Sequence, residues 1–460
     1  MMNTYEPSIF RAYDMRGIYP SQMNEKVAYA AGQAFVSVTA ARTVAVGRDV
    51  RSTGESLERA LIQGVLDAGA NVIEIGVIST EMMYYAAGML DCDGGMSLTA
   101  SHNPAEWNGI KFIGKGALPL TKEGDLGKIY DFIQSGRELK QFNPGELHMK
   151  DIRAEYVAYL EKYAPKNLRA LKLVVNVNFG ANGKIVDEAV KDLPLTVVRL
   201  NWNEDGTFPK GTPDPLLPSN RKELSERIVT EAADFGVAFD ADADRAFFYD
   251  EKGRAFPGYY IETMLAEHFL SLEPGAGIAY DPRLTWAVEA AVRRGEGRPY
   301  ITKTGHGYFK QSLRENGAVF GGENSGHFYY RDFFCCDSGL LTFLLVMGIF
   351  NEQILANGKV SEILEQYRNS YPASDELNFI TDRAKEIVED AKVKYADATI
   401  TSLDGTSVEY LDYRFNLRLS NNEPVLRLNL EAKTPEDLAQ RLAEVQGFIT
   451  SFGAKLRNDE

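Results

Sequence analysis

The segment Thr99-Ala100-Ser101-His102-Asn103-Pro104 places a reactive hydroxyl in a short polar loop. Asn103-Pro104 favours a turn, because proline fixes its own φ and restricts the residue before it. Ser101 could therefore act as a nucleophile or carry a phosphoryl group. The alternative is a serine that only bonds to its own turn. The apolar run at 110–113 predicts a strand that leaves the loop.

A cluster of carboxylates follows a predicted buried strand at 236–239. Asp240, Asp242 and Asp244 alternate with alanines, and Arg245 comes next. Closely spaced carboxylates repel one another unless a cation lies among them, and three oxygen ligands suit Mg²⁺. Arg245 could hold a phosphoryl group beside that ion. The alternative is an acidic surface turn, but an apolar strand that leads directly into the cluster favours an ordered site.

The pattern excludes an EF-hand. Counted from Asp240, the sixth and twelfth positions of that loop require glycine and glutamate. Arg245 and Glu251 stand at these places. Glu251 therefore matches the twelfth position, but Arg245 replaces the glycine that allows the sharp turn at the sixth, and this mismatch argues against an EF-hand.

A glycine-rich stretch at 321–327 carries further polar groups. Glu323 and Ser325 could bind sugar hydroxyls, and His327 could act as an acid or a base. A plain glycine-rich turn is the alternative. Arg283 and His306 each follow a predicted strand, at the position where sites form in α/β domains.

Two loops with arginine could bind phosphate, because the guanidinium matches its geometry. A solvated surface loop is the alternative for the first of them. The first loop spans 10–17 and the second 418–424. Their candidate residues are Tyr13, Arg16, Arg418, Ser420, Asn421 and Asn422.

A strand–helix–strand unit recurs three times. In each copy the two strands start a little over twenty residues apart, enough for a crossover helix. This pattern predicts a threefold internal repeat of α/β units, although ordinary α/β architecture could also produce it. The first copy has strands at 43–46 and 71–75 around a helix that Ser52 or Thr53 caps and Gly69 ends. The strand, helix and strand of the other two copies are 171–177, 184–191 and 195–200, then 277–280, 285–293 and 298–302.

The last part of the chain has a different order of elements. A helix near 380–390 precedes predicted strands at 398–403, 413–419 and 424–432, and Thr434-Pro435 begins a helix with an N-cap and an N1 proline. This order predicts a smaller α+β domain. The expected domains are 1–147, 148–249, 250–365 and 366–460.

The composition limits the classes of partner. The 460 residues are 44% apolar and 25% charged, with 50 basic and 65 acidic side chains and a net charge of −15. This balance predicts a soluble globular protein that binds neither nucleic acid nor anionic membranes. The three cysteines form no metal or disulfide pattern, and no signal peptide is evident, so we expect a cytoplasmic protein. The apolar run at 339–350 predicts a buried helix.

Four motifs in this order resemble those of the α-D-phosphohexomutase family. Thr-Ala-Ser-His-Asn-Pro resembles its phosphoserine loop, Asp-Ala-Asp-Ala-Asp-Arg its metal loop, Gly-Glu-Asn-Ser-Gly-His its sugar loop and Arg-Leu-Ser-Asn-Asn-Glu-Pro its phosphate loop. The resemblance covers essentially the whole chain. It is strongest to bacterial phosphomannomutases of the nucleotide-sugar pathways. Asn324 replaces a more common methionine, and Asn422 stands where threonine is more common.

The resemblance implies three similar α/β domains with mixed sheets and a smaller C-terminal α+β domain, arranged around a central cleft. It also implies that Ser101 carries a phosphoryl group. One Mg²⁺ per chain would be held by Ser101, Asp240, Asp242 and Asp244. The expected catalytic residues are Ser101, His102, Arg16, Lys111 and His327, with Lys111 as the competitor of His327 for proton transfer. The expected substrate-binding residues are Tyr13, Arg245, Arg283, His306, Glu323, Ser325, Arg418, Ser420, Asn421 and Asn422.

The expected activity is the interconversion of mannose 1-phosphate and mannose 6-phosphate through a hexose 1,6-bisphosphate, which also acts as an activator. The alternative is a mutase of glucose phosphates or of both sugars. A phosphoglucosamine mutase is less expected, since its phosphate loop normally reads Ser-Gly-Thr. More distant alternatives are a metal-dependent phosphatase with an aspartate nucleophile and a non-catalytic sugar-phosphate binder. The expected partners are hexose phosphates, and the expected assembly is a monomer or a homodimer.

Overall fold

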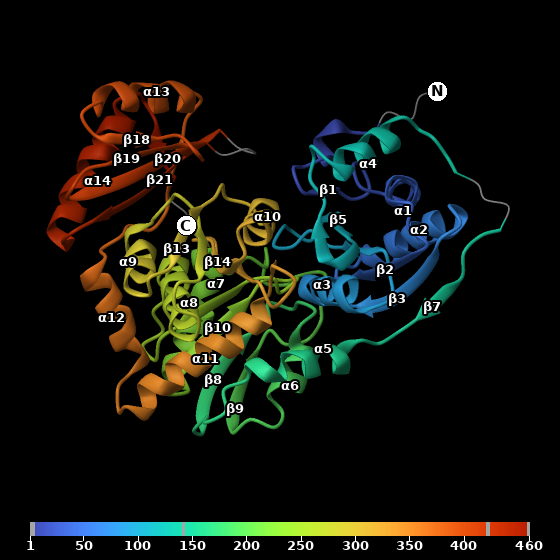
Figure 1. The fold of residues 1–460 in the computed structure, drawn as a ribbon, viewed down its shortest axis with the longest axis horizontal. Coiled ribbons are helices and arrows are strands. Elements are labelled where there is room, and N and C mark those ends of the chain that lie inside the picture. Colours follow the sequence, from blue (N-terminus) through green and yellow to red (C-terminus); the bar gives the residue numbers. More distant parts are fainter. Residues whose placement is uncertain (1–4, 140–142, 420–423, 458–460) are drawn as a thin grey trace.

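The computed structural model describes residues 5–139, 143–419 and 424–457. Within these residues four sheets follow one another along the chain. Figure 1 shows the first domain in blue to teal, the second and third in green to orange, and the C-terminal domain in red as a separate body beside the third. The expected fold class, three α/β domains and a smaller α+β domain, is confirmed.

The first sheet has the order β1-β5-β4-β2-β3-β7, with β6 paired to β5. Its β2, β3 and β4 strands are parallel, whereas β5 runs antiparallel to β4 and β1. The helices α1 and α2 cross closely, because a Cβ atom on Gly64 would lie 2.1 Å from the carbonyl oxygen of Tyr29. The elements are β1 (Asp14–Ile18), α1 (Glu25–Thr39), β2 (Thr43–Arg48), α2 (Gly54–Asp67), β3 (Asn71–Val77), α3 (Thr80–Met89), β4 (Gly94–Leu98), β5 (Trp107–Gly114), β6 (Leu118–Pro119), α4 (Asp125–Gln134) and β7 (Leu147–Met149), with short 3-10 turns at Pro7–Ile9 and Lys115–Ala117.

The second and third sheets have the orders β11-β10-β8-β9 and β13-β12-β14-β15-β16. Each contains a parallel pair joined by a helix, as the repeat predicts. The second domain has α5 (Arg153–Leu160), a 3-10 turn at Glu161–Tyr163, β8 (Leu171–Asn176), α6 (Gly183–Val190), β9 (Leu195–Leu200), α7 (Pro218–Thr230), β10 (Phe235–Phe239) and β11 (Ala246–Tyr249). The third has α8 (Gly258–Leu272), β12 (Gly277–Tyr280), α9 (Trp286–Arg294), β13 (Arg298–Ile301), α10 (His306–Asn316), β14 (Ala318–Gly322), β15 (Phe328–Tyr330), β16 (Cys336–Asp337), α11 (Gly339–Leu355) and α12 (Val360–Ser370).

The three domains place their reactive loops at the same point of the fold. In each sheet a strand that is parallel to its neighbour is followed by an antiparallel strand: β4 by β5, β10 by β11 and β14 by β15. The serine loop, the aspartate loop and the glycine-rich loop are these three connections. The internal repeat therefore brings the three motifs to equivalent sheet edges.

The fourth sheet has the order β18-β19-β20-β21-β17-β22. The helix predicted near 380–390 begins only at Ala384, because Ile380 belongs to a strand that the sequence analysis missed. The helix predicted after Thr434 is present, and the Thr434 side chain accepts from the Asp437 amide at 3.0 Å. The elements are β17 (Leu377–Ile380), α13 (Ala384–Lys394), β18 (Thr399–Thr401), β19 (Thr406–Glu409), β20 (Tyr413–Leu419), β21 (Val425–Ala432), α14 (Pro435–Thr450) and β22 (Lys455–Leu456).

The hydrophobic cores divide the molecule unequally. One buried cluster is continuous from α3 of the first domain through the second and third sheets, and it includes most of α11. The fourth domain has a core of its own around Phe415 and Leu428. Among the described helices none is by itself long and apolar enough to cross a membrane, and α11 with α12 meets those criteria only as a pair bent by 100°.

Candidate active site

Ser101 lies in the connection between β4 and β5 and is buried. Its φ of +50° is the left-handed region, which is uncommon for a residue other than glycine and marks a constrained loop. Its Oγ atom lies 3.2 Å from Nδ1 of His102 and donates to Oδ2 of Asp240, also at 3.2 Å. The serine of the first domain therefore meets the aspartate loop of the second.

The aspartate loop follows β10 directly, and Asp240, Asp242 and Asp244 are all buried. Lys111 Nζ donates to Oδ2 of Asp242 at 2.8 Å and to Oδ2 of Asp244 at 2.6 Å. Burial opposes ionisation of Asp242, but Lys111 and the hydroxyl of Thr80 hold its pKa well below the usual range. Two positive side chains, Lys111 and Arg245, therefore balance part of this acidic cluster.

Asp240 differs from its neighbours. Burial raises the pKa of Asp240 to about 8, against the opposing charge of Arg245 and with repulsion from the other two aspartates. Arg245 Nε donates to its Oδ2 at 2.9 Å. A third cation at this loop, besides Lys111 and Arg245, would relieve the cost of keeping the three carboxylates charged.

The aspartate loop fits a divalent cation. One carboxylate oxygen from each of Asp240, Asp242 and Asp244 lies within 4.8 Å of the others. Oδ1 of Asp242 and Oδ1 of Asp244 are buried without a hydrogen-bond partner in the described structure. Buried carboxylate oxygens need a donor or a cation, and three oxygen ligands suit Mg²⁺. The acidic cluster can therefore hold a metal ion.

Two further cationic groups border the serine loop. Arg16 on β1 donates from Nη1 to Oδ1 of Asn103 at 2.8 Å, and its Nε pairs with Asp14. Arg245 Nη2 lies 2.7 Å from Nδ1 of His102. Burial, Arg245 and Arg16 lower the pKa of His102 well below its usual value, so that this imidazole is neutral.

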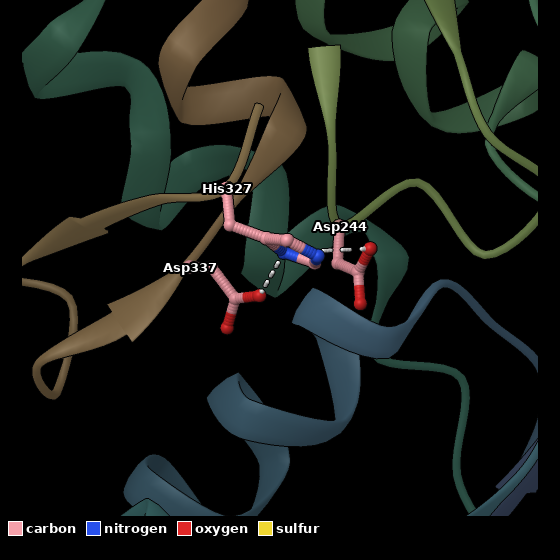
Figure 2. A group of neighbouring side chains, drawn as sticks. All are labelled: Asp244, His327 and Asp337. Atoms are coloured by element: carbon pink, nitrogen blue, oxygen red, sulfur yellow. Dashed lines mark hydrogen bonds and ion pairs between the residues drawn. The ribbon is translucent and has the colours of Figure 1, made fainter. Parts of the chain in front are cut away.

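His327 stands between two carboxylates (Figure 2). Its Nδ1 atom lies 2.8 Å from Oδ2 of Asp337 and 3.9 Å from Oδ1 of Asp244. Asp337 is fully buried and also pairs with Lys310 Nζ at 2.9 Å. Burial opposes protonation, but Asp244 and Asp337 raise the pKa of His327 above its usual value. A carboxylate at Nδ1 fixes the ring and leaves Nε2 to exchange a proton.

The glycine-rich loop is held from inside the third domain. Glu323 is buried, accepts from the Gly305 amide at 2.7 Å and accepts from the hydroxyl of Tyr329 at 2.7 Å. Ser325 is partly exposed. Tyr13 of the first domain packs against His306, with ring centroids 4.8 Å apart, and both line one small pocket with Lys111.

A second group of charges lies where the third and fourth domains meet. Arg283 pairs with Asp281 through Nη2 at 2.6 Å, and Arg418 donates from Nη1 to Oγ1 of Thr304 at 3.2 Å. Glu376 lies 3.6 Å from Arg418 and 3.5 Å from Arg427. Ser420, Asn421 and Asn422, the other expected residues of the phosphate loop, lie outside the described residues.

A buried joint connects these two domains. Glu431 of β21 accepts from the Thr285 amide at 2.7 Å, next to the first turn of α9, and from Arg414 Nη1 at 3.2 Å. Arg414 also donates to the carbonyl oxygens of Pro282 and Arg283, at 2.8 and 3.0 Å. The loop that carries Arg283 is therefore anchored to the fourth domain.

The structure brings together the serine, aspartate and histidine motifs, and it adds side chains that the sequence analysis missed. These are Asp49, Arg51, Thr80, Lys310, Asp337 and Arg427. Asp49 and Arg51 could have been predicted as site residues, because they follow the carboxyl end of the parallel strand β2. The other four residues reach the site only because the domains pack together, so that local sequence does not reveal them.

Four family models match successive parts of the chain. They describe phosphoglucomutase/phosphomannomutase alpha/beta/alpha domain I over residues 7–140, domain II over 154–253, domain III over 257–371 and the C-terminal domain over 376–446. Together these models cover most of the sequence in the order of the four sheets.

Individual relatives agree with the family models. The chain is 41% identical to a phosphomannomutase of Escherichia coli over 95% of this chain and 97% of the relative. It is 40% identical to the phosphomannomutase of Vibrio cholerae over 93% and 95%. A crystal structure of a phosphoglucomutase/phosphomannomutase family protein from Burkholderia thailandensis superposes with a TM-score of 0.88 at 30% identity, over 98% of this chain and 100% of that chain. The chain therefore belongs to the phosphoglucomutase/phosphomannomutase family of phosphohexomutases.

Proposed function

We propose that the protein interconverts mannose 1-phosphate and mannose 6-phosphate. The observation that carries the proposal is the position of Ser101, whose Oγ lies 3.2 Å from Asp240 in a loop bordered by Arg16, His102 and Arg245. Such a serine can carry a phosphoryl group among cations, and the names of the relatives favour mannose as the sugar. Ser101 would donate its phosphoryl group to the free hydroxyl of the sugar phosphate, which gives a hexose 1,6-bisphosphate. The other phosphate would then return to Ser101.

One Mg²⁺ per chain would be held by Asp240, Asp242, Asp244 and the phosphorylated Ser101, which the three buried carboxylates support. When bound, the ion supplies positive charge at the transferring group. Arg16, Arg245 and Lys111 would add further charge there. Positioning and charge stabilisation account for most of phosphoryl-transfer catalysis.

His327 is the better candidate for proton transfer. Its Nδ1 faces Asp337, so Nε2 can take the proton from the attacking sugar hydroxyl and return it to the leaving oxygen. The ammonium group of the competitor Lys111 already donates hydrogen bonds to Asp242, Asp244 and Thr80. That arrangement favours a purely electrostatic role for Lys111.

The sugar phosphate would bind between the third and fourth domains and the serine. Glu323 and Ser325 would contact sugar hydroxyls, with Tyr13, Arg283 and His306 alongside. Arg418 would bind the phosphate that is not transferred, together with Ser420, Asn421 and Asn422. Arg418 ends β20 and faces Thr304 of the third domain, which supports a subsite at this junction.

The test is a side-by-side measurement of kcat/KM for mannose 1-phosphate and glucose 1-phosphate, with Mg²⁺ and a trace of hexose bisphosphate. We expect both 6-phosphates to form, with the higher kcat/KM for mannose, and turnover to vanish in Ser101→Ala. A higher kcat/KM for glucose 1-phosphate would show that glucose, and not mannose, is the preferred sugar. A Ser101→Ala variant that still converts the substrates would overturn the mechanism and favour the aspartate-nucleophile alternative.

A further inference from the structure

Arg51 is a buried arginine whose five N–H donors are all engaged. Its Nε donates to Oδ2 of Asp49 at 3.2 Å. Its two terminal nitrogens donate to four carbonyl oxygens of one loop. These belong to Ser101 and Asn103, each at 2.7 Å, Pro104 at 2.6 Å and Trp107 at 2.9 Å. A guanidinium offers five N–H groups in a fixed plane, so this set uses its full capacity.

The same network reaches the amide of the serine itself. Thr99 Oγ1 donates to Oδ2 of Asp49 at 2.7 Å and accepts from the Ser101 amide at 2.8 Å. Both the amide and the carbonyl of Ser101 are therefore tied to the Asp49–Arg51 pair. Since the φ of Ser101 is +50°, a backbone conformation that costs energy is held from both sides.

The second domain closes over this arginine. The ring centroid of Phe208 lies 5.1 Å from Arg51 Cζ, and Phe208 is buried. The backbone of Arg51 forms a bridge with Gly206, where a Cβ atom would lie 2.1 Å from the carbonyl oxygen of Val50. The domain that carries the aspartate loop thus packs directly on the residue that holds the serine loop.

We propose that Arg51 is a positioning residue for phosphoryl transfer, which fixes Ser101 relative to the aspartate loop without touching the substrate. The inference rests on the proposed mutase function. Lysine cannot replace this arginine, because an ammonium group has three donors and cannot span four carbonyls. A small displacement of a nucleophile is expected to slow the chemical step far more than it weakens binding.

The experiment compares Arg51→Lys with the wild-type protein. Ser101 is phosphorylated with glucose 1,6-bisphosphate, and the rate and final extent are followed by intact-protein mass spectrometry. We expect full phosphorylation at a rate at least 100-fold lower, a matching fall in kcat and a KM for mannose 1-phosphate within threefold of wild type. If Arg51 only stabilised the fold, the final extent of Ser101 phosphorylation would fall, because only the folded fraction would react. The rate at which that folded fraction is phosphorylated would stay at the wild-type value.

Two further variants keep the test decisive. Thr99→Val is nearly isosteric and removes only the link between Asp49 and the Ser101 amide, so we expect a rate at least tenfold lower even if Arg51→Lys does not fold. Arg48→Lys is the matched control, because Arg48 pairs with Glu58 at the same strand end, and its rate should stay within twofold. Wild-type rates in both Arg51→Lys and Thr99→Val would overturn the proposal.

A separate readout distinguishes this inference from the proposed function. If the wild-type protein neither turns over hexose phosphates nor accepts the phosphoryl group, the proposed function fails. Hydrogen exchange at residues 101–107 then still tests whether Arg51 holds this loop in place. Faster exchange in Arg51→Lys confined to this loop supports the role of Arg51, and unchanged exchange refutes it.

Discussion

Replacing Asp337 with asparagine tests whether this carboxylate orients His327. Asp337 accepts from His327 at 2.8 Å and pairs with Lys310 at 2.9 Å, and it is fully buried. Asparagine keeps the shape but removes the charge. If its amide nitrogen faces Nδ1, the imidazole proton must move to Nε2, the nitrogen that would exchange a proton with the substrate.

The size of the effect follows from the bond that is lost. A hydrogen bond to a charged group contributes about 1.5–3 kcal/mol, and about 2.7 kcal/mol corresponds to a 100-fold change in rate. We therefore expect kcat to fall about 100-fold in Asp337→Asn, with KM changed by less than about threefold. The variant should also lose stability, because Lys310 is left as a buried cation without its carboxylate, a defect that typically costs about 3–5 kcal/mol.

A second variant separates orientation from stability. Asp337→Asn combined with Lys310→Met removes both charges, so the thermal unfolding midpoint should recover while kcat remains low. Asp332→Asn is the control, since Asp332 is an exposed aspartate on the neighbouring turn, paired with Arg331. The assay is steady-state turnover of mannose 1-phosphate with thermal unfolding of the same samples. A kcat within twofold of wild type in Asp337→Asn, or full recovery of kcat in the double variant, would refute the reasoning.

Three other outcomes are expected. Arg418→Gln should raise the KM for mannose 1-phosphate about 10- to 100-fold, the value of one charged hydrogen bond, with a smaller change in kcat; an unchanged KM would exclude Arg418 from the phosphate subsite. Burial raises the pKa of Glu81 to about 7, so the folded protein holds a proton that the unfolded chain releases above about pH 4.5, and stability falls as pH rises through this window. Glu81→Gln should remove that fall, about 3 kcal/mol between pH 4.5 and 7, which denaturant titrations at several pH values would measure, and an identical pH dependence in both proteins would contradict it. Removal of metal with EDTA should abolish turnover, and Mg²⁺ at 100 times its Kd should restore it and stabilise the fold by about 2.7 kcal/mol, whereas turnover that survives EDTA would argue against the metal site.

The repeated α/β units could be predicted closely because their strands are short apolar runs with clear ends. The predicted strand at 195–200 is β9, and the predicted strand at 171–177 exceeds β8 by one residue. The fourth domain was predicted less well. β19 (Thr406–Glu409) is short and mostly polar in sequence, so nothing in its residues distinguishes it from a loop. β17 ends shortly before α13, and its last residue, Ile380, was included in the predicted helix.

Some residues of the candidate site could likewise be predicted from local sequence, and others could not. Ser101 and the three aspartates lie within short segments whose residue types already indicate chemistry. Thr80 contacts Asp242 across 162 positions of sequence, so that its role depends on how two domains pack. Asp337 is similar, because a carboxylate beside a cysteine gives no sign that a histidine ten residues earlier will face it. Local patterns can show which groups react, whereas the groups that hold them in place come from the assembled fold.

The buried contact between Glu431 of the fourth domain and the third domain can act as the pivot about which the fourth domain rotates. Glu431 and Arg414 face each other across β20 and β21, and Arg418 lies four residues further along β20. At about 3.4 Å per residue the distance from the joint to Arg418 is about 14 Å, so a rotation of about 10° would move Arg418 by about 2 Å. That displacement exceeds what a hydrogen bond to Thr304 tolerates. The fourth domain has its own core, so it can turn as a unit, and a small swing is enough to grip or release a phosphate at this end of the strand.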